Sequence, residues 1–151
     1  MLRLSRMTDY GTLVMMHMAQ APEVVHSAND IAQHTKLPEP SVRKVLKIMV
    51  RSELLCSVRG LKGGYRLAKA PKEISLESLI TALEGTTVAI TDCCDDEQTD
   101  HCDQYEACHM RPHWAVINQS IRSALQGVTV QDLLSATPIT TQNSTVAEGL
   151  A

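Results

Sequence analysis

The chain has 151 residues and a formal net charge of −3, a size that accommodates one modest core and at most a small appendage. No apolar run approaches the roughly 20 residues that a membrane-spanning helix needs, and no signal-type apolar segment follows the first residues, so we exclude a membrane partner and expect a cytoplasmic protein. Residues 1–70 carry 11 basic and 5 acidic side chains, whereas residues 71–151 carry 3 and 12. A basic first half favours a polyanionic partner.

The first half of the sequence predicts three helices. Thr8 precedes a helical apolar pattern that continues to about Ala21 and stops at Pro22. Ser27 is placed to cap a short helix over Ala28–His34, and after a turn at 35–37 a further helix runs from 38–41 to about Ser52. The last helix turns apolar side chains inward (Val42, Val45, Leu46, Met49) and basic ones outward (Arg43, Lys44, Lys47, Arg51). Two helices joined by a short turn indicate a helix-turn-helix unit.

A glycine-rich hairpin follows the third helix. Alternation at Cys56–Val58 and Tyr65–Leu67 predicts two short strands joined through Gly60, Gly63 and Gly64, and Cys56 is expected to fill the core as a small hydrophobe. A hairpin beside a helix-turn-helix is a wing. We therefore expect DNA contacts in the major groove from Ser41, Arg43, Lys44 and Lys47, and contacts with phosphates or the adjacent minor groove from Arg59, Lys62 and Arg66.

The second half predicts a helix from Ser75 to Gly85, another over His113–Gln126, and a short one over 129–134. The helix over His113–Gln126 carries an apolar stripe that lies too far along the chain to join the winged core, so we expect it to form a dimer interface. The stripe consists of Trp114, Ile117, Ile121 and Leu125. The expected fold is mainly α with a small β-hairpin: a winged helix-turn-helix domain (1–85), a cysteine-rich loop (86–111), a dimerisation helix with a terminal helix (112–136) and a disordered tail (137–151).

Four of the five cysteines lie between Asp92 and Trp114, together with seven carboxylates and a single basic residue, Arg111. Thiolates and carboxylates crowded into one short loop repel one another, and in a reducing setting such a cluster is more often a metal or cofactor site than a disulfide framework. Zinc suits Cys and His ligands, but structural zinc sites favour shorter gaps between cysteines. Thiols that respond by disulfide exchange are a further alternative. No catalytic constellation is recognisable, so we do not expect an enzyme.

A resemblance to one known family rests on the segment from Leu2 to Tyr10, on Ile31-Ala32, on Val58-Arg59-Gly60 with Gly63-Gly64-Tyr65, and on three spaced cysteines before a Trp-bearing helix. Over residues 2 to about 135 the sequence resembles the Rrf-type winged-helix transcriptional regulators, the IscR/NsrR-like family. The sequence is most similar to the branch that regulates the SUF iron–sulfur assembly operon. The resemblance implies a homodimer that binds promoter DNA and holds an iron–sulfur cluster, [2Fe–2S] rather than [4Fe–4S], through three cysteines and one other ligand.

The resemblance places the three cysteine ligands at Cys102, Cys108 and either Cys93 or Cys94. The gap before Cys102 is longer than is usual in the family: eight residues separate it from Cys93, or seven from Cys94. Where IscR-like members have a histidine ligand, this chain has Arg111, which cannot ligate iron because it stays protonated. The candidates for the fourth ligand are therefore His109, His113 or, as in NsrR-like proteins, Asp9 of the other subunit.

The implied function is a cluster-sensing repressor of iron–sulfur assembly genes. The alternatives are a nitric-oxide or redox-responsive repressor of the same family, and a metal or cluster carrier that does not bind DNA.

Overall fold

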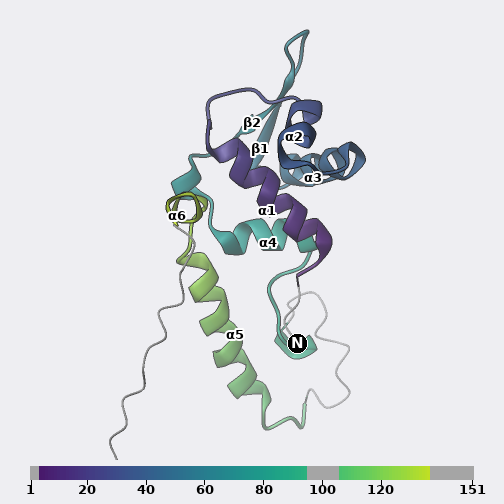
Figure 1. The fold of residues 1–151 in the computed structure, drawn as a ribbon. Helices are drawn as coiled ribbons and strands as arrows, with labels where there is room; N and C mark the ends of the chain where they lie inside the picture. The colour runs from purple at the N-terminus through teal and green to yellow at the C-terminus, as the bar shows by residue number, and fades with distance from the viewer. Residues whose placement is uncertain (1–3, 95–105, 137–151) are drawn as a thin grey trace, which may run out of the picture.

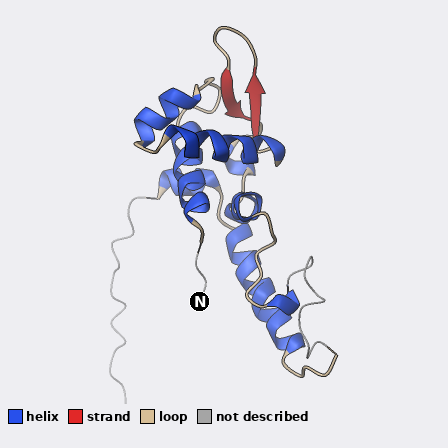
Figure 2. Cartoon of the chain, turned by 90° about the vertical axis from the view of Figure 1, so that its right-hand side faces the viewer, coloured by secondary structure: helices blue, strands red, loops and turns tan. Residues whose placement is uncertain are grey.

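The computed structural model describes residues 4–94 and 106–136, which form a helical body with one protruding hairpin (Figures 1 and 2). The helices are α1 (Arg6–Ala19), α2 (Ala28–Thr35), α3 (Glu39–Arg51), α4 (Leu76–Glu84), α5 (Arg111–Gln126) and α6 (Val130–Ser135). The strands are β1 (Leu55–Val58) and β2 (Gly64–Leu67), and two short 3₁₀ turns are η1 (Pro71–Glu73) and η2 (Asp92–Cys94). The predicted class, mainly α with a small hairpin, is confirmed. None of the described helices is long and apolar enough to cross a bilayer.

Helix α1 begins earlier than expected. Its N-cap is Ser5, whose hydroxyl accepts a hydrogen bond from the Thr8 amide, whereas the sequence pattern had placed Thr8 before the helix. Thr8 instead lies within the first turn with no exposed surface. The prediction was wrong because Ser5, three residues earlier, provides the cap. The Thr8 hydroxyl makes a tertiary contact instead and donates a short hydrogen bond to Glu84 at the end of α4.

The helix-turn-helix is confirmed. Helix α2 is capped by Ser27 and ends at Lys36, which adopts a left-handed conformation (φ 56°), and α3 follows after two residues. The four inward-facing side chains predicted for α3 are completely buried, and α3 packs against both α1 and α2. This packing leaves the basic face of α3 in solvent.

The wing is a two-stranded antiparallel sheet in which Leu55 pairs with Leu67 and Cys56 pairs with Arg66. Leu55 and Leu67 are buried, while Cys56 is exposed, so the prediction that Cys56 fills the core was wrong. Side chains alternate between the two faces of a strand. Because Leu55 takes the inward face, Cys56 must turn outward beside Arg66.

The C-terminal helices return to the winged domain. Helix α5 begins at Arg111, with Pro112 in its first turn, and it packs against α4. Helix α6 lies against α1 and η1. Two backbone hydrogen bonds attach the α5–α6 connection to the start of α4, from the Leu76 amide to the Val128 carbonyl (2.8 Å) and from the Val130 amide to the Ile74 carbonyl (2.9 Å). Val130 is fully buried in the same core as α1 and α3. Figure 1 shows α5 extending from this attachment away from the wing.

Candidate nucleic-acid interface and cysteine segment

The basic face of α3 is open to solvent. Arg43, Lys44 and Lys47 are exposed and Ser41 is half-buried. The Arg43 guanidinium forms a salt bridge with Glu39, one helical turn earlier: its Nη2 and Nε atoms lie 2.5 and 2.9 Å from Glu39 Oε1. Such an exposed pair contributes little to stability. Arg43 can therefore exchange this carboxylate for a base edge or a phosphate at small cost.

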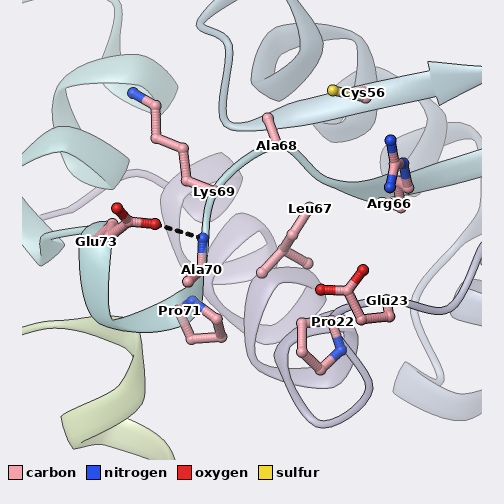
Figure 3. A pocket seen from close by; sticks show the side chains of 10 residues that line it. All are labelled: Pro22, Glu23, Cys56, Arg66, Leu67, Ala68, Lys69, Ala70, Pro71 and Glu73. Carbon is pink, nitrogen blue, oxygen red and sulfur yellow. Dashed lines mark hydrogen bonds between the residues drawn. The ribbon is translucent and has the colours of Figure 1, made fainter.

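The wing is anchored to the body on its β2 side. His26 and Tyr65 exchange two backbone hydrogen bonds of 2.8 Å each, which joins the α1–α2 loop to β2. Arg59, Lys62 and Arg66 are all exposed. Arg66 also lines a pocket of about 270 Å³ at the base of the wing, together with Cys56, Glu23 and Lys69 (Figure 3). The predicted cationic wing is thus held in a fixed position relative to α1.

Three histidines that the sequence analysis did not single out form a cluster where α1, α2 and the loop between them meet. The ring centroids of His17 and His34 are 5.0 Å apart, and those of His17 and His26 are 5.3 Å apart. Burial, with the added repulsion of the two neighbouring imidazoles, lowers the pKa of His17 below its ordinary value. His34 donates through Nδ1 to the Asp30 carbonyl at 2.8 Å. The three residues come from α1, α2 and the loop between them, so only the tertiary fold reveals the cluster.

A carboxylate on α4 forms a second contact that sequence reasoning missed. Glu84 Oε1 accepts hydrogen bonds from the Thr8 hydroxyl and from the Ser5 amide. Burial acts to raise the pKa of Glu84, but these hydrogen bonds outweigh it and hold the pKa below its ordinary value. The contact links the first turn of α1 to the last residue of α4, just before the chain enters the cysteine-rich loop (86–111), which we call the cysteine segment.

The described part of the cysteine segment lies against α5. Cys93 and Cys94 belong to η2, and the Thr91 hydroxyl lies 3.3 and 3.4 Å from their sulfur atoms. η2 packs on α5, and the Ile90 amide donates to the buried Asn118 side chain of α5 at 3.1 Å. The segment that carries the first thiols is therefore fastened to the middle of α5.

The remaining predicted ligands are distributed around α5 and α1. Cys108 is half-buried just before α5 and lines a pocket of about 380 Å³ with Arg111. His109 and His113 are exposed close by, and Cys102 lies outside the described residues. Asp9 is exposed on α1. Within 4–94 and 106–136, no three metal-binding side chains converge on one point, so these residues alone do not complete a site.

The donor set nevertheless suits a soft metal centre. The four cysteines in the described part of the chain are free thiols, and the Thr91 hydroxyl is placed to hydrogen-bond to the sulfur atoms of η2. Hydrogen bonds to ligating sulfur are among the features that tune iron–sulfur centres. The thiol groups on η2 and before α5 thus fit a cluster, which would be completed by a further thiol and one other ligand.

The apolar stripe of α5 divides into two parts. Trp114 and Ile121 are half-buried, and Ile117 is 42 % exposed next to Val116 at 68 %. Leu125 instead lines an apolar groove of about 540 Å³ formed with α1, α4 and α6. Leu125 therefore lies beside the winged domain without joining its hydrophobic core, because α6 brings the end of α5 back to that domain. The role of the stripe as a dimer interface stays a prediction.

A helix-turn-helix whose second helix presents a basic face beside a cationic wing defines a winged-helix DNA-binding protein. The comparison with known families makes the assignment specific: the chain belongs to the Rrf2 family, described as iron-dependent transcriptional regulators, which matches residues 4–136. It is a transcriptional regulator that binds DNA, and not an enzyme.

Two kinds of relatives support this assignment. The HTH-type transcriptional regulator NsrR of Oceanobacillus iheyensis is 28% identical over 137 residues, which cover 88% of this chain and 90% of that protein. Among solved structures, the IscR of T. potens is similar with a TM-score of 0.66 and 27% identity, over 98% of this chain and 94% of that one. CymR of B. subtilis, described as its global cysteine regulator, has a TM-score of 0.67 and 27% identity, over 91% of this chain and 99% of that one.

Proposed function

We propose that the chain acts as a homodimeric repressor of iron–sulfur cluster assembly genes, as in the SUF branch, and that it senses an iron–sulfur cluster, [2Fe–2S] rather than [4Fe–4S]. The ligands are Cys94 or its neighbour Cys93, Cys102, Cys108 and one of His109, His113 or the partner's Asp9. The observation that carries the proposal is the position of the thiols: Cys93 and Cys94 lie on a turn packed on α5, and Cys108 immediately precedes the same helix.

Binding of a cluster would join η2 to the start of α5 through its thiolate ligands, within a segment that holds seven carboxylates and one arginine between Asp92 and Trp114. Because η2 and Asn118 fasten that segment to α5, the free energy of cluster binding can bias the position of this helix. An effector shifts an equilibrium only through unequal affinity for its two states. The proposed states differ in the angle of α5 within the dimer, and hence in the spacing of the two α3 helices on DNA.

The first test is purification without oxygen, followed by visible absorption and by iron and sulfide analysis. A brown protein that contains both elements supports the cluster, whereas a colourless protein loaded with zinc, or one with no metal at all, contradicts it. The absorption spectrum and the iron-to-protein ratio also distinguish [2Fe–2S] from [4Fe–4S].

The second test measures occupancy of the protein's own upstream DNA with and without iron starvation. The variant Cys102→Ala/Cys108→Ala should lose the response to iron. Cys56→Ala is the matched control, because Cys56 is an exposed thiol on β1, outside the cysteine segment. An unchanged iron response in the double variant would contradict the sensing role. Failure of the wild type to shift this DNA would favour a carrier role instead.

A second candidate within the family is a regulator that responds to nitric oxide or to thiol redox state. The similarity to NsrR and to CymR, together with the free thiols, favours this alternative over any outside the family. It predicts that DNA release follows nitric oxide or a disulfide-forming oxidant while the response to iron starvation is absent.

A further inference from the structure

The tip of the wing is a tight turn whose two central residues are Leu61 and Lys62. The Gly63 amide donates to the Gly60 carbonyl at 3.0 Å, which closes the four-residue turn. Gly60 has a φ of 122°, a conformation that favours glycine. A Cβ atom on Gly63 would lie 2.6 Å from the Val58 carbonyl oxygen. The glycines therefore fix the turn, and Leu61 is presented from a defined backbone.

Leu61 is the most exposed large hydrophobic residue of the described chain. Its relative exposure is 110%, compared with 68% for Val116 on α5. Turn positions ordinarily favour Gly, Asn, Asp or Ser, because these residues adopt or stabilise turn conformations. Leucine has no such conformational advantage in a turn. A single exposed leucine is common on protein surfaces. What distinguishes Leu61 is the set of charges around it.

The wing carries only positive charge near this leucine. Residues 54–67 include Arg59, Lys62 and Arg66 and no acidic residue, so a cation lies on each side of Leu61 in the chain. This order of cation, apolar side chain and cation matches the DNA minor groove, which has phosphates along both walls and base edges at its floor. Apolar side chains that enter this groove part neighbouring base pairs and kink the duplex.

The length of the wing suits that position. About six residues separate the start of β1 from the tip, and at about 3.3 Å per residue they span roughly 20 Å. Half a turn of DNA, the distance from a major groove to the flanking minor groove, is about 17 Å. β1 packs against α3, and both views show the hairpin projecting beyond α3 (Figures 1 and 2). With α3 in a major groove, the tip reaches the adjacent minor groove.

We propose that Leu61 is a wedge that enters the minor groove beside each half-site and opens one base step. The inference rests on the DNA-reading role of the wing and extends it, because the cost of opening a step depends on sequence. Pyrimidine–purine steps unstack most easily. The protein would thus select such a step at a position where no hydrogen bond reads a base.

The test uses a duplex selected from random-sequence DNA by the wild-type protein, with 2-aminopurine substituted at each flanking step in turn. Wild type should raise the fluorescence at one step and shorten the end-to-end distance measured by energy transfer. Leu61→Ser should lose both signals and bind about tenfold more weakly, since the apolar contact is removed. Its thermal midpoint and the salt dependence of its binding should not change, because Leu61 is exposed and uncharged. Leu61→Met should retain the fluorescence signal.

Lys62→Ala is the matched control from the same turn. It should reduce the slope of log affinity against log salt by about one unit while it retains the fluorescence signal. Full fluorescence and unchanged affinity in Leu61→Ser would overturn the wedge. A loss of binding to phosphatidylserine vesicles in Leu61→Ser, with DNA bending intact, would overturn it in favour of a membrane contact. If wild type selects no duplex, the failure lies with the DNA-binding function itself.

Discussion

Replacing Val130 by alanine tests whether α6 is part of the winged domain. Val130 is fully buried in the core that contains α1 and α3. The change removes the equivalent of two methylene groups, about 0.8 kcal/mol each, and leaves a small cavity, so the free energy of unfolding should fall by about 2 kcal/mol. For a chain of this size the melting temperature should fall by roughly 4–8 °C.

The assay is urea unfolding followed by circular dichroism, with Gln131→Ala as the control, because Gln131 is the exposed neighbour on the same helix. Hydrogen exchange adds a local readout. The amides of Leu76 and Val130, which bond to the Val128 and Ile74 carbonyls, should exchange faster in Val130→Ala than in the control. If the two variants unfold within about 0.5 kcal/mol of each other, α6 does not belong to the cooperative core and the argument is refuted.

Three further predictions concern single side chains. His17 has a pKa below its ordinary value of 6.5 because of burial and of the charges on His26 and His34. The unfolded chain therefore binds more protons at this residue, and the free energy of unfolding should decrease as the pH falls below about 6.5. Urea unfolding at two pH values should show a smaller decrease in His17→Gln than in the wild type, and an equal decrease would contradict the assignment. Thr8→Val removes the hydroxyl that bonds to Glu84 and should cost about 1 kcal/mol in urea unfolding, whereas no loss would mean that water replaces this contact without penalty. Arg59→Ala should weaken DNA binding and reduce the salt slope by about one unit if Arg59 contacts one phosphate; an unchanged slope in binding titrations would remove Arg59 from the interface.

The winged helix-turn-helix could be predicted because its signals are local. The N-cap at Ser27, the inward-facing apolar residues of α3 and the glycines of the hairpin lie within a few residues of the elements they define. The helix-turn-helix and the wing indicate a DNA-binding role, the family resemblance agrees with it, and the match to a family of transcriptional regulators over residues 4–136 confirms it.

What could not be predicted depends on contacts between distant segments. The burial of Thr8 follows from Glu84, 76 residues away, which accepts a hydrogen bond from its hydroxyl. Cys56 is exposed because Leu55 and Leu67 fix which face of the hairpin points inward. The docking of Val130 and the histidine cluster likewise follow only from the packing of separate elements. The ligand set also stays a prediction, since Cys102 lies outside the described residues.

The hydrogen bond between Ile90 and Asn118 has a consequence for variation among relatives. One flank of the cysteine segment is tied to the middle of α5, and the other flank runs directly into the start of that helix. Closing a longer connection between two fixed ends costs only about 0.6 kcal/mol for each doubling of its length. Insertions and deletions can therefore accumulate between Cys94 and Cys108 without shifting the DNA-reading surface, so ligand spacing can diverge while the architecture is inherited unchanged.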